Sequence, residues 1–141
     1  MIGICFKYNP GYKSLLRDQY YELIKAFPGL TIFEREVHED EPDDYNGQVF
    51  TRITDADDLS LDSTLVILTG QDANNIQGTI NLKDYVHPEN AIYFFGDDQS
   101  NLTQEKIGNR VDYDKVYIPI QANVWSAQAI AIVLYDRQSK E

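Results

Sequence analysis

The chain has 141 residues, enough for one domain with a sizeable core, and 43% of them are hydrophobic, which argues against disorder. A single cysteine excludes a disulfide framework, and a net charge of −11 opposes functions that need a broadly basic surface. No segment resembles a signal peptide or a membrane span. We therefore expect one domain over residues 1–141 and a cytoplasmic, reducing location.

The acidity is concentrated in one connection. Residues 38–62 contain nine acidic residues and one basic residue, so −8 of the total −11 lies there and only −3 remains for the rest of the chain. A solvated loop explains such a run without any binding function. A local basic face elsewhere in the chain stays compatible with this distribution.

The N-terminal segment predicts a strand, a turn and a helix. Ile2–Tyr8 is an apolar run typical of a buried first strand, and Cys5 within it is expected to be a buried side chain. The turn sequence Asn9-Pro10-Gly11 follows. Ser14 can then cap a helix that has apolar residues at helical spacing and ends near Phe27.

Four further segments follow in the middle of the chain. Thr31–Val37 alternates like a strand with one wetter face, which favours a place near a sheet edge, and Gln48–Thr54 suits a short strand or helix. Thr64–Thr69 and Ala91–Phe95 are apolar runs typical of buried strands, and each ends at a glycine. Between these two runs, a short helix is expected around Leu82–Val86.

The C-terminal part predicts a short helix over Thr103–Ile107, then a strand from Val116 that ends near Pro119, because proline cannot donate to a strand ladder. A helix follows over residues 126–137, with apolar residues on more than one side. Strands that alternate with helices indicate an α/β fold with a mostly parallel sheet. In such sheets ligands bind beyond the carboxyl ends of the strands.

Several kinds of site can be weighed against this pattern. No glycine-rich phosphate loop is present, and His38 and His87 are isolated, so we expect exposed loop histidines and no metal site. Asp97-Asp98 could bind a metal or serve as acid and base, although a solvated turn is the simpler interpretation. Neither Ser100 nor Ser126 lies in a nucleophile elbow.

The C-terminal segment carries a more specific signal. The run IPIQANVWSAQAIAIVLYD resembles the last motif of the SpoU/TrmH-like branch of the SPOUT RNA methyltransferases, I-P-M-x-G-x-x-x-S-L-N followed by an alanine-rich helix. The matching positions run without a gap from Ile118 to Gln128. YFFGDDQSNL resembles the family's second motif, F-G-x-E-x-x-G-L, with Phe95, Gly96 and Asp98 in matching places.

The first motif of this family, N-x-G-x-x-x-R, is matched only in part. Asn9 and Gly11 fit, whereas Arg17 lies two residues beyond the position of the family's catalytic arginine. Ala122 stands where the family has glycine, and Gln128 stands where it has asparagine. The resemblance covers the chain from residue 64 to residue 137 and indicates a divergent member.

The resemblance implies a parallel sheet with helices on both faces and a C-terminal trefoil knot, an exception to the rule that chains do not thread loops. S-adenosylmethionine would lie bent in the knot, held mainly by the backbone of three loops. The corresponding residues here are Leu68, Thr69, Gly70, Phe95, Gly96, Asp97, Asp98, Ile118, Ile120, Ala122, Ser126 and Ala127. A homodimer that buries the knot and the C-terminal helix is also implied.

The implied reaction is methyl transfer to a ribose 2′-hydroxyl of RNA, with transfer RNA favoured because so short a chain lacks an added RNA-binding domain. Arg17, Ser126 and Gln128 are the implied catalytic residues, and Asn9 and Lys13 join Arg17 as substrate-binding residues. Two alternatives remain: a SPOUT-fold protein that binds cofactor or RNA without catalysis, and an unknotted nucleotide- or partner-binding α/β module.

Overall fold

The computed structural model describes residues 1–7, 19, 22–35, 44–45, 48–69, 78–96, 109–120 and 126–141. The strands are β1 (Ile2–Lys7), β2 (Leu30–Arg35), β3 (Asp44–Tyr45), β4 (Gln48–Ile53), β5 (Thr64–Thr69), β6 (Thr79–Asn81), β7 (Ala91–Phe94) and β8 (Tyr113–Tyr117). Two 3₁₀ turns, η2 (Ala56–Asp58) and η4 (Leu82–Asp84), and one long helix, α3 (Ser126–Ser139), complete these elements. Residues 22–26 are also helical.

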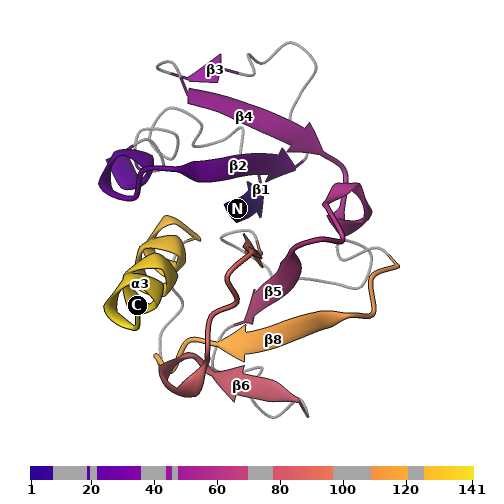
Figure 1. Cartoon of the computed structure of the whole chain (residues 1–141). Coiled ribbons are helices and arrows are strands. Elements are labelled where there is room, and N and C mark those ends of the chain that lie inside the picture. Colours follow the sequence, from indigo (N-terminus) through magenta and orange to yellow (C-terminus); the bar gives the residue numbers. More distant parts are fainter. Residues whose placement is uncertain are drawn as a thin grey trace.

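The strands form one sheet in the order β3-β4-β2-β1-β7-β5-β8-β6 (Figure 1). Every neighbouring pair is parallel except β3 and β4, which pair antiparallel at one edge. The prediction of an α/β fold with a mostly parallel sheet is therefore confirmed. Because parallel strands all end at the same side of the sheet, their carboxyl ends form one continuous edge.

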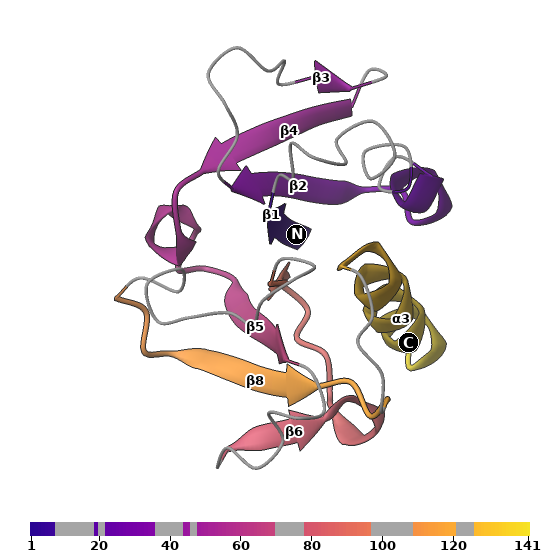
Figure 2. The same cartoon turned by 180° about the vertical axis from the view of Figure 1, so that it is seen from behind.

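Apolar side chains cover both faces of the sheet. On β5, Val66 and Leu68 belong to one buried cluster, and Leu65 and Ile67 belong to the other, because successive side chains of a strand point to opposite faces. Figures 1 and 2 place α3 and the helical residues 22–26 on the first face and η2 on the second. Cys5 lies in the second cluster at 0% exposure, so its predicted burial is confirmed.

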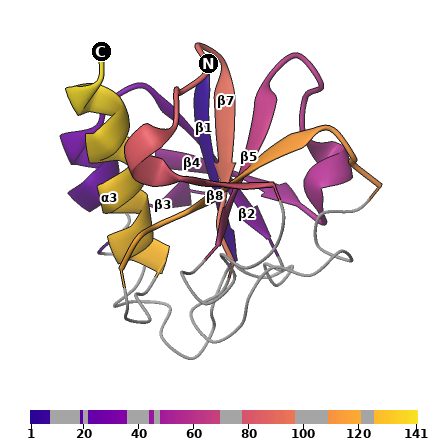
Figure 3. The ribbon, with the colours of Figure 1, turned by 90° about the horizontal axis from the view of Figure 1, so that it is seen from below.

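Helix α3 packs along the first face and runs opposite to the strands. Seen from below, the C-terminal end of α3 lies toward the end of the sheet where β1 starts, and its first turn lies toward the end where the strands finish (Figure 3). Ala127, Ile130, Val133 and Leu134 are buried at helical spacing, whereas Tyr135 is 68% exposed. Burial of α3 is therefore extensive but leaves one side free within the described residues.

Three details differ from the sequence-based expectations. Strand β2 was expected near an edge and is not itself an edge strand, because β4 (Gln48–Ile53) pairs with its outer side. Strand β8 begins at Tyr113, three residues before the apolar residues that marked it, since Asp114 and Lys115 hide the pattern. Strand β6 was missed because it has only three residues and an exposed centre. The expected helix over residues 103–107 lies outside the described residues.

Candidate functional site

The carboxyl ends of β7, β5 and β8 lie next to one another in the sheet. The register aligns Ile67 with Phe94 and Thr69 with Tyr117, so the residues that follow these strands start from a common edge. Of the residues expected to bind a cofactor, the structure places six at this edge: Leu68, Thr69, Phe95, Gly96, Ile118 and Ile120. A seventh, Ala127, lies in the first turn of α3. Segments far apart in the sequence are thus brought together where a ligand is expected.

Backbone hydrogen bonds extend the ladder beyond the strands. Phe95 N donates to Cys5 O at 2.9 Å, and Ile118 N donates to Thr69 O at 3.3 Å. Ile120 N donates to Ile118 O at 2.8 Å, which turns the chain tightly around Pro119. The proline that was expected only to stop a strand therefore sits at a sharp turn at the end of β8.

One buried hydroxyl at this edge lacks a protein partner. Thr69 Oγ1 is shielded from solvent and has no hydrogen-bond partner among the described residues. A buried unpaired polar atom costs about 1–3 kcal/mol unless something else satisfies it. Near it in the chain and the sheet, Leu68, Phe95 and Ile118 are at most 6% exposed and belong to the core cluster on the first face of the sheet. A buried hydroxyl at the carboxyl edge of the sheet that no described residue uses is available to a ligand with a hydrogen-bonding atom.

A second polar group at the same edge was not anticipated. Arg35, the last residue of β2, is 1% exposed, and its Nη2 donates to Phe95 O at 2.5 Å. Its guanidinium carbon lies 4.6 Å from the centre of the Phe94 ring. Its Nε and Nη1 atoms have no hydrogen-bond partner within the described part of the chain. The sequence held one indication that Arg35 is buried: strand alternation puts it on the same face of β2 as Phe33.

The thiol of Cys5 lies on the same face of the sheet but has no reactive character. Burial raises the pKa of Cys5 to about 12, although the positive charge of Arg35 acts in the opposite direction. A thiol with this pKa stays protonated at neutral pH and is a poor nucleophile. Cys5 is therefore a packing residue.

The remaining predicted site residues are only partly described. Ser126 is the first residue of α3, and its side chain is not described; Gln128, in the first turn of the helix, is exposed. Asn9, Lys13, Arg17, Gly70, Asp97, Asp98 and Ala122 lie outside the described residues. Their roles stay predictions.

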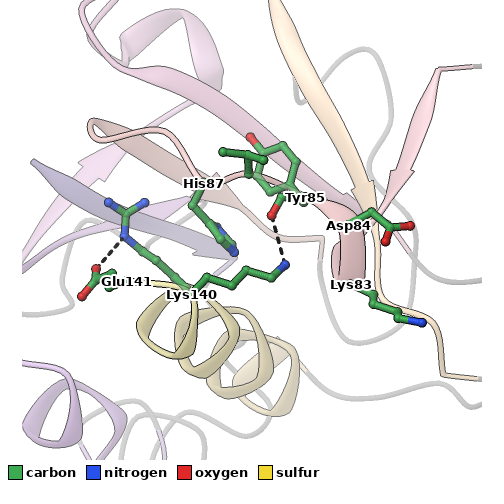
Figure 4. Close-up of a pocket in the computed structure, with 8 residues that line it drawn as sticks. Lys83, Asp84, Tyr85, His87, Lys140 and Glu141 are labelled. Atoms are coloured by element: carbon green, nitrogen blue, oxygen red, sulfur yellow. Dashed lines mark hydrogen bonds and ion pairs between the residues drawn. The ribbon is translucent and has the colours of Figure 1, made fainter.

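A cavity of about 330 Å³ opens at the other end of the sheet (Figure 4). Its lining includes Lys83, Tyr85, His87, Arg137 and Lys140, which come from the segment before β7 and from the end of α3. Lys140 Nζ donates to Leu82 O at 2.6 Å and to Tyr85 O at 3.0 Å, and it contacts Asp136 Oδ2 at 2.8 Å. The three hydrogens of this ammonium group are thereby used for structure, so it does not serve an anionic ligand.

His87 beside this cavity is buried, so its predicted exposure is wrong. Its side chain is 5% exposed, with Nδ1 2.7 Å from Tyr93 Oη and Nε2 2.7 Å from Asp136 Oδ2. Desolvation lowers the pKa of His87 and so favours the neutral ring, although Asp136 acts in the opposite direction. The turn-rich sequence around His87 predicted a solvent-exposed side chain, but α3 packs against this segment and buries the imidazole ring.

The hydrogen-bond roles around His87 follow from its neighbours. Arg137 Nη1 donates to Tyr93 Oη at 3.0 Å and to Pro88 O at 2.6 Å. The Tyr93 oxygen therefore already accepts one bond, and its own hydrogen is available for His87 Nδ1. His87 Nε2 then carries the proton that Asp136 accepts. We call His87, Tyr93, Asp136, Arg137 and Lys140 the helix clamp, because together they hold the end of α3.

The described residues form neither a metal-binding cluster nor a helix that could span a membrane. No group of three or more histidine, cysteine, aspartate or glutamate side chains among them is arranged to hold a metal ion. In the same residues, no helix has both the length and the apolar character that crossing a membrane requires.

Comparison with known proteins identifies the fold. No protein-family description matches the chain, and no curated protein matches it by sequence. Among solved structures, the chain superimposes on a protein from Porphyromonas gingivalis assigned to the TrmH family of RNA methyltransferases, with a TM-score of 0.67 and 13% identity. A second solved structure, from work on the 2-OH methylation of C/U34 on tRNA, superimposes with a TM-score of 0.65 and 14% identity. A third, a methylase family protein from Haemophilus influenzae, superimposes with a TM-score of 0.57 and 16% identity.

These likenesses extend over almost the whole chain. The three superpositions cover 99%, 99% and 98% of this chain. They cover 60% of the Porphyromonas gingivalis protein, 90% of the protein from the tRNA study and 65% of the Haemophilus influenzae protein. The chain therefore spans less than two thirds of the first and third proteins. The resemblance to SpoU/TrmH-like proteins is confirmed at the level of the fold.

Proposed function

We propose that this chain is an S-adenosylmethionine-dependent RNA methyltransferase that modifies a ribose 2′-hydroxyl, with transfer RNA as the substrate. The observation that supports it most is the meeting of three separate segments at the carboxyl ends of β5, β7 and β8. The fold shared with TrmH-family proteins supports the same conclusion, and one of those structures concerns tRNA 2-OH methylation.

The described edge fits the proposed cofactor in its chemistry. We propose that Leu68, Phe95 and Ile118, which are buried at the ends of three adjacent strands, lie next to the adenosine. Thr69 Oγ1 supplies a hydrogen bond that no described residue uses. Gly96 permits close approach of a ligand to the backbone. We propose that Gly70, Asp97, Asp98, Ile120, Ala122, Ser126 and Ala127 complete this site.

When bound, S-adenosylmethionine supplies an electrophilic methyl group whose bond to sulfur breaks as the bond to oxygen forms. The protein must hold the ribose hydroxyl in line with that methyl group, because alignment supplies much of the rate. Arg17 is proposed to hold the nucleotide phosphate and make the hydroxyl more acidic, since a guanidinium with a pKa above about 12 is a poor base. Asn9 and Lys13 are proposed to bind the RNA, and Ser126 and Gln128 to contact the reacting nucleotide.

Two further features belong to this proposal. The C-terminal segment is proposed to form a trefoil knot around the cofactor, in the passage between β8 and α3. The chain is proposed to form a homodimer through the exposed side of α3, where Tyr135 is 68% exposed and Ile132 is partly buried. A homodimer would cover this remaining apolar surface.

Calorimetric titration with S-adenosylmethionine and its demethylated product tests the proposal. Binding of both compounds, together with methylation of tRNA that Arg17→Ala abolishes, is the expected result. Absence of heat and of any thermal shift contradicts it and favours a partner-binding α/β module. Binding that survives Arg17→Ala, with no methylation by the wild type, favours a SPOUT-fold binding protein without catalysis.

A further inference from the structure

Arg35 is costly to bury. Moving a cation out of water costs several kcal/mol even after relaxation, and an apolar residue of similar volume is often as good or better for stability. Arg35 is nevertheless 1% exposed in the interior of the sheet. Such a residue calls for a role that an apolar side chain could not fill.

The contact of Arg35 joins two strands that do not pair with each other. Strands β2 and β7 lie on either side of β1, and the Arg35 side chain crosses β1 to reach the carbonyl of Phe95 at 2.5 Å. The Phe94 ring supports the guanidinium from 4.6 Å, on the face of the sheet that Cys5 also lines. Hydrogen bonds from a charged donor are about twice as strong as neutral ones, so this contact fixes the carbonyl direction firmly.

The carbonyl in question lies at the root of a site segment. Phe95 follows the last residue of β7 and precedes Gly96, and both belong to the proposed cofactor site. Phe95 N is held by Cys5 O at 2.9 Å, so Arg35 fixes the opposite side of the same residue. With both of its backbone polar groups held, Phe95 gives the following segment a defined starting direction.

We infer that Arg35 is a positioning residue for cofactor binding, acting through the Phe95 carbonyl and not by touching the cofactor. This inference rests on the proposed function. Arg35 would act on the cofactor-binding segment after β7, whereas Arg17 is proposed to act on the RNA. Loss of Arg35 should therefore weaken cofactor binding more than it weakens the fold.

The variants are Arg35→Met, which keeps the length but removes the charge and the donors, and Arg35→Lys, which keeps the charge. Arg110→Met is the matched control. Arg110 is also buried, at 9% exposure, and donates to Ser60 O at 3.3 Å and Ser63 O at 3.5 Å, but it lies before β8 at the amino end of the sheet. Each protein is titrated with the demethylated cofactor, and its unfolding midpoint is measured.

Arg35→Met should raise the Kd by about tenfold or more, the loss expected for one charge-assisted hydrogen bond. Arg35→Lys should lie between this variant and the wild type, and Arg110→Met should bind like the wild type. Equal binding by wild type and Arg35→Met overturns the inference but leaves the proposed function intact. If Arg35→Met does not fold, wild-type affinity of Arg35→Lys overturns it instead.

Hydrogen exchange separates this inference from a failure of the proposed function. Peptides that contain Phe95 and Gly96 should exchange about tenfold faster in Arg35→Met than in wild type, without any ligand. Unchanged exchange there contradicts the inference even if the wild type binds no cofactor. Absence of wild-type binding together with faster exchange rejects the proposed function and limits Arg35 to fixing the segment.

Discussion

His87 Nε2 lies 2.7 Å from Asp136 Oδ2, and this contact joins the segment before β7 to the last turns of α3. Tyr93 and Arg137 continue the connection on the other side of the imidazole ring. The helix clamp thus fixes the C-terminal end of α3 at the amino end of the sheet. Since the first turn of α3 belongs to the proposed site, the clamp also determines where that turn can lie.

Tyr93→Phe should destabilise the protein by about 1–3 kcal/mol, because it leaves buried donor and acceptor atoms of Arg137 and His87 without their shared partner. Urea unfolding measures the change. Tyr135→Phe is the control, since Tyr135 lies on the same helix with 68% exposure and should leave the midpoint unchanged. Equal effects of the two substitutions would show that the hydroxyl of Tyr93 has no structural role.

Stability should depend on pH through His87. Its pKa is lowered below the ordinary 6.5, so at intermediate pH the unfolded chain binds a proton that the folded chain does not. The stabilisation is fully present above about pH 6.5 and is lost as pH falls through the folded-state pKa. His87→Gln should flatten this part of the stability profile, measured as the free energy of unfolding at several pH values. An unchanged slope would locate the titration elsewhere.

Local pattern was sufficient to predict much of this fold. The apolar runs gave β5 and β7 to within one residue, and the spacing of apolar residues gave α3 to within two, because burial leaves a clear apolar signal in the sequence. The parallel arrangement followed from strands alternating with helices. The motif from Ile118 to Gln128 then indicated where the site should form.

The parts that sequence could not supply depend on tertiary neighbours. Whether β2 lies at an edge is decided by β4, a segment whose own pattern was ambiguous. His87 is buried only because α3 packs against its segment, and Arg35 gains its role from Phe95, sixty residues further along. None of these relations has a local periodicity, so no window of sequence carries them.

Thr69→Val should separate cofactor binding from stability. The substitution keeps the shape and removes a buried hydroxyl that no described residue pairs with, so the free protein should be as stable as wild type or more stable. Affinity for the demethylated cofactor should fall about three- to tenfold if the ligand uses this hydroxyl. Thr64→Val, at the other end of β5, is the control in the same calorimetric titration. Wild-type affinity in Thr69→Val would remove Thr69 from the site.

Gly3→Ala should destabilise the sheet by about 1–3 kcal/mol through overpacking. A Cβ at Gly3 would lie 3.1 Å from Phe33 Cε2 and 3.3 Å from Ile92 Cγ1, on strands to either side of β1. Phe33→Leu removes the closer contact, so the double variant should lose less stability than the sum of the single variants. Thermal unfolding of the four proteins measures this coupling; simple additivity would mean that Phe33 moves aside freely.

Alkaline hydrolysis of labelled RNA tests directly the proposal that this chain transfers a methyl group to a ribose hydroxyl. Unmodified tRNA is incubated with the protein and S-adenosylmethionine labelled in the methyl group, and the RNA is then hydrolysed in alkali. A 2′-O-methylated ribose cannot cleave its own phosphodiester bond, so we expect the label in alkali-resistant dinucleotides. Label in mononucleotides would place the methyl group on a base, and RNA without label, from a protein that binds the cofactor, would contradict catalysis.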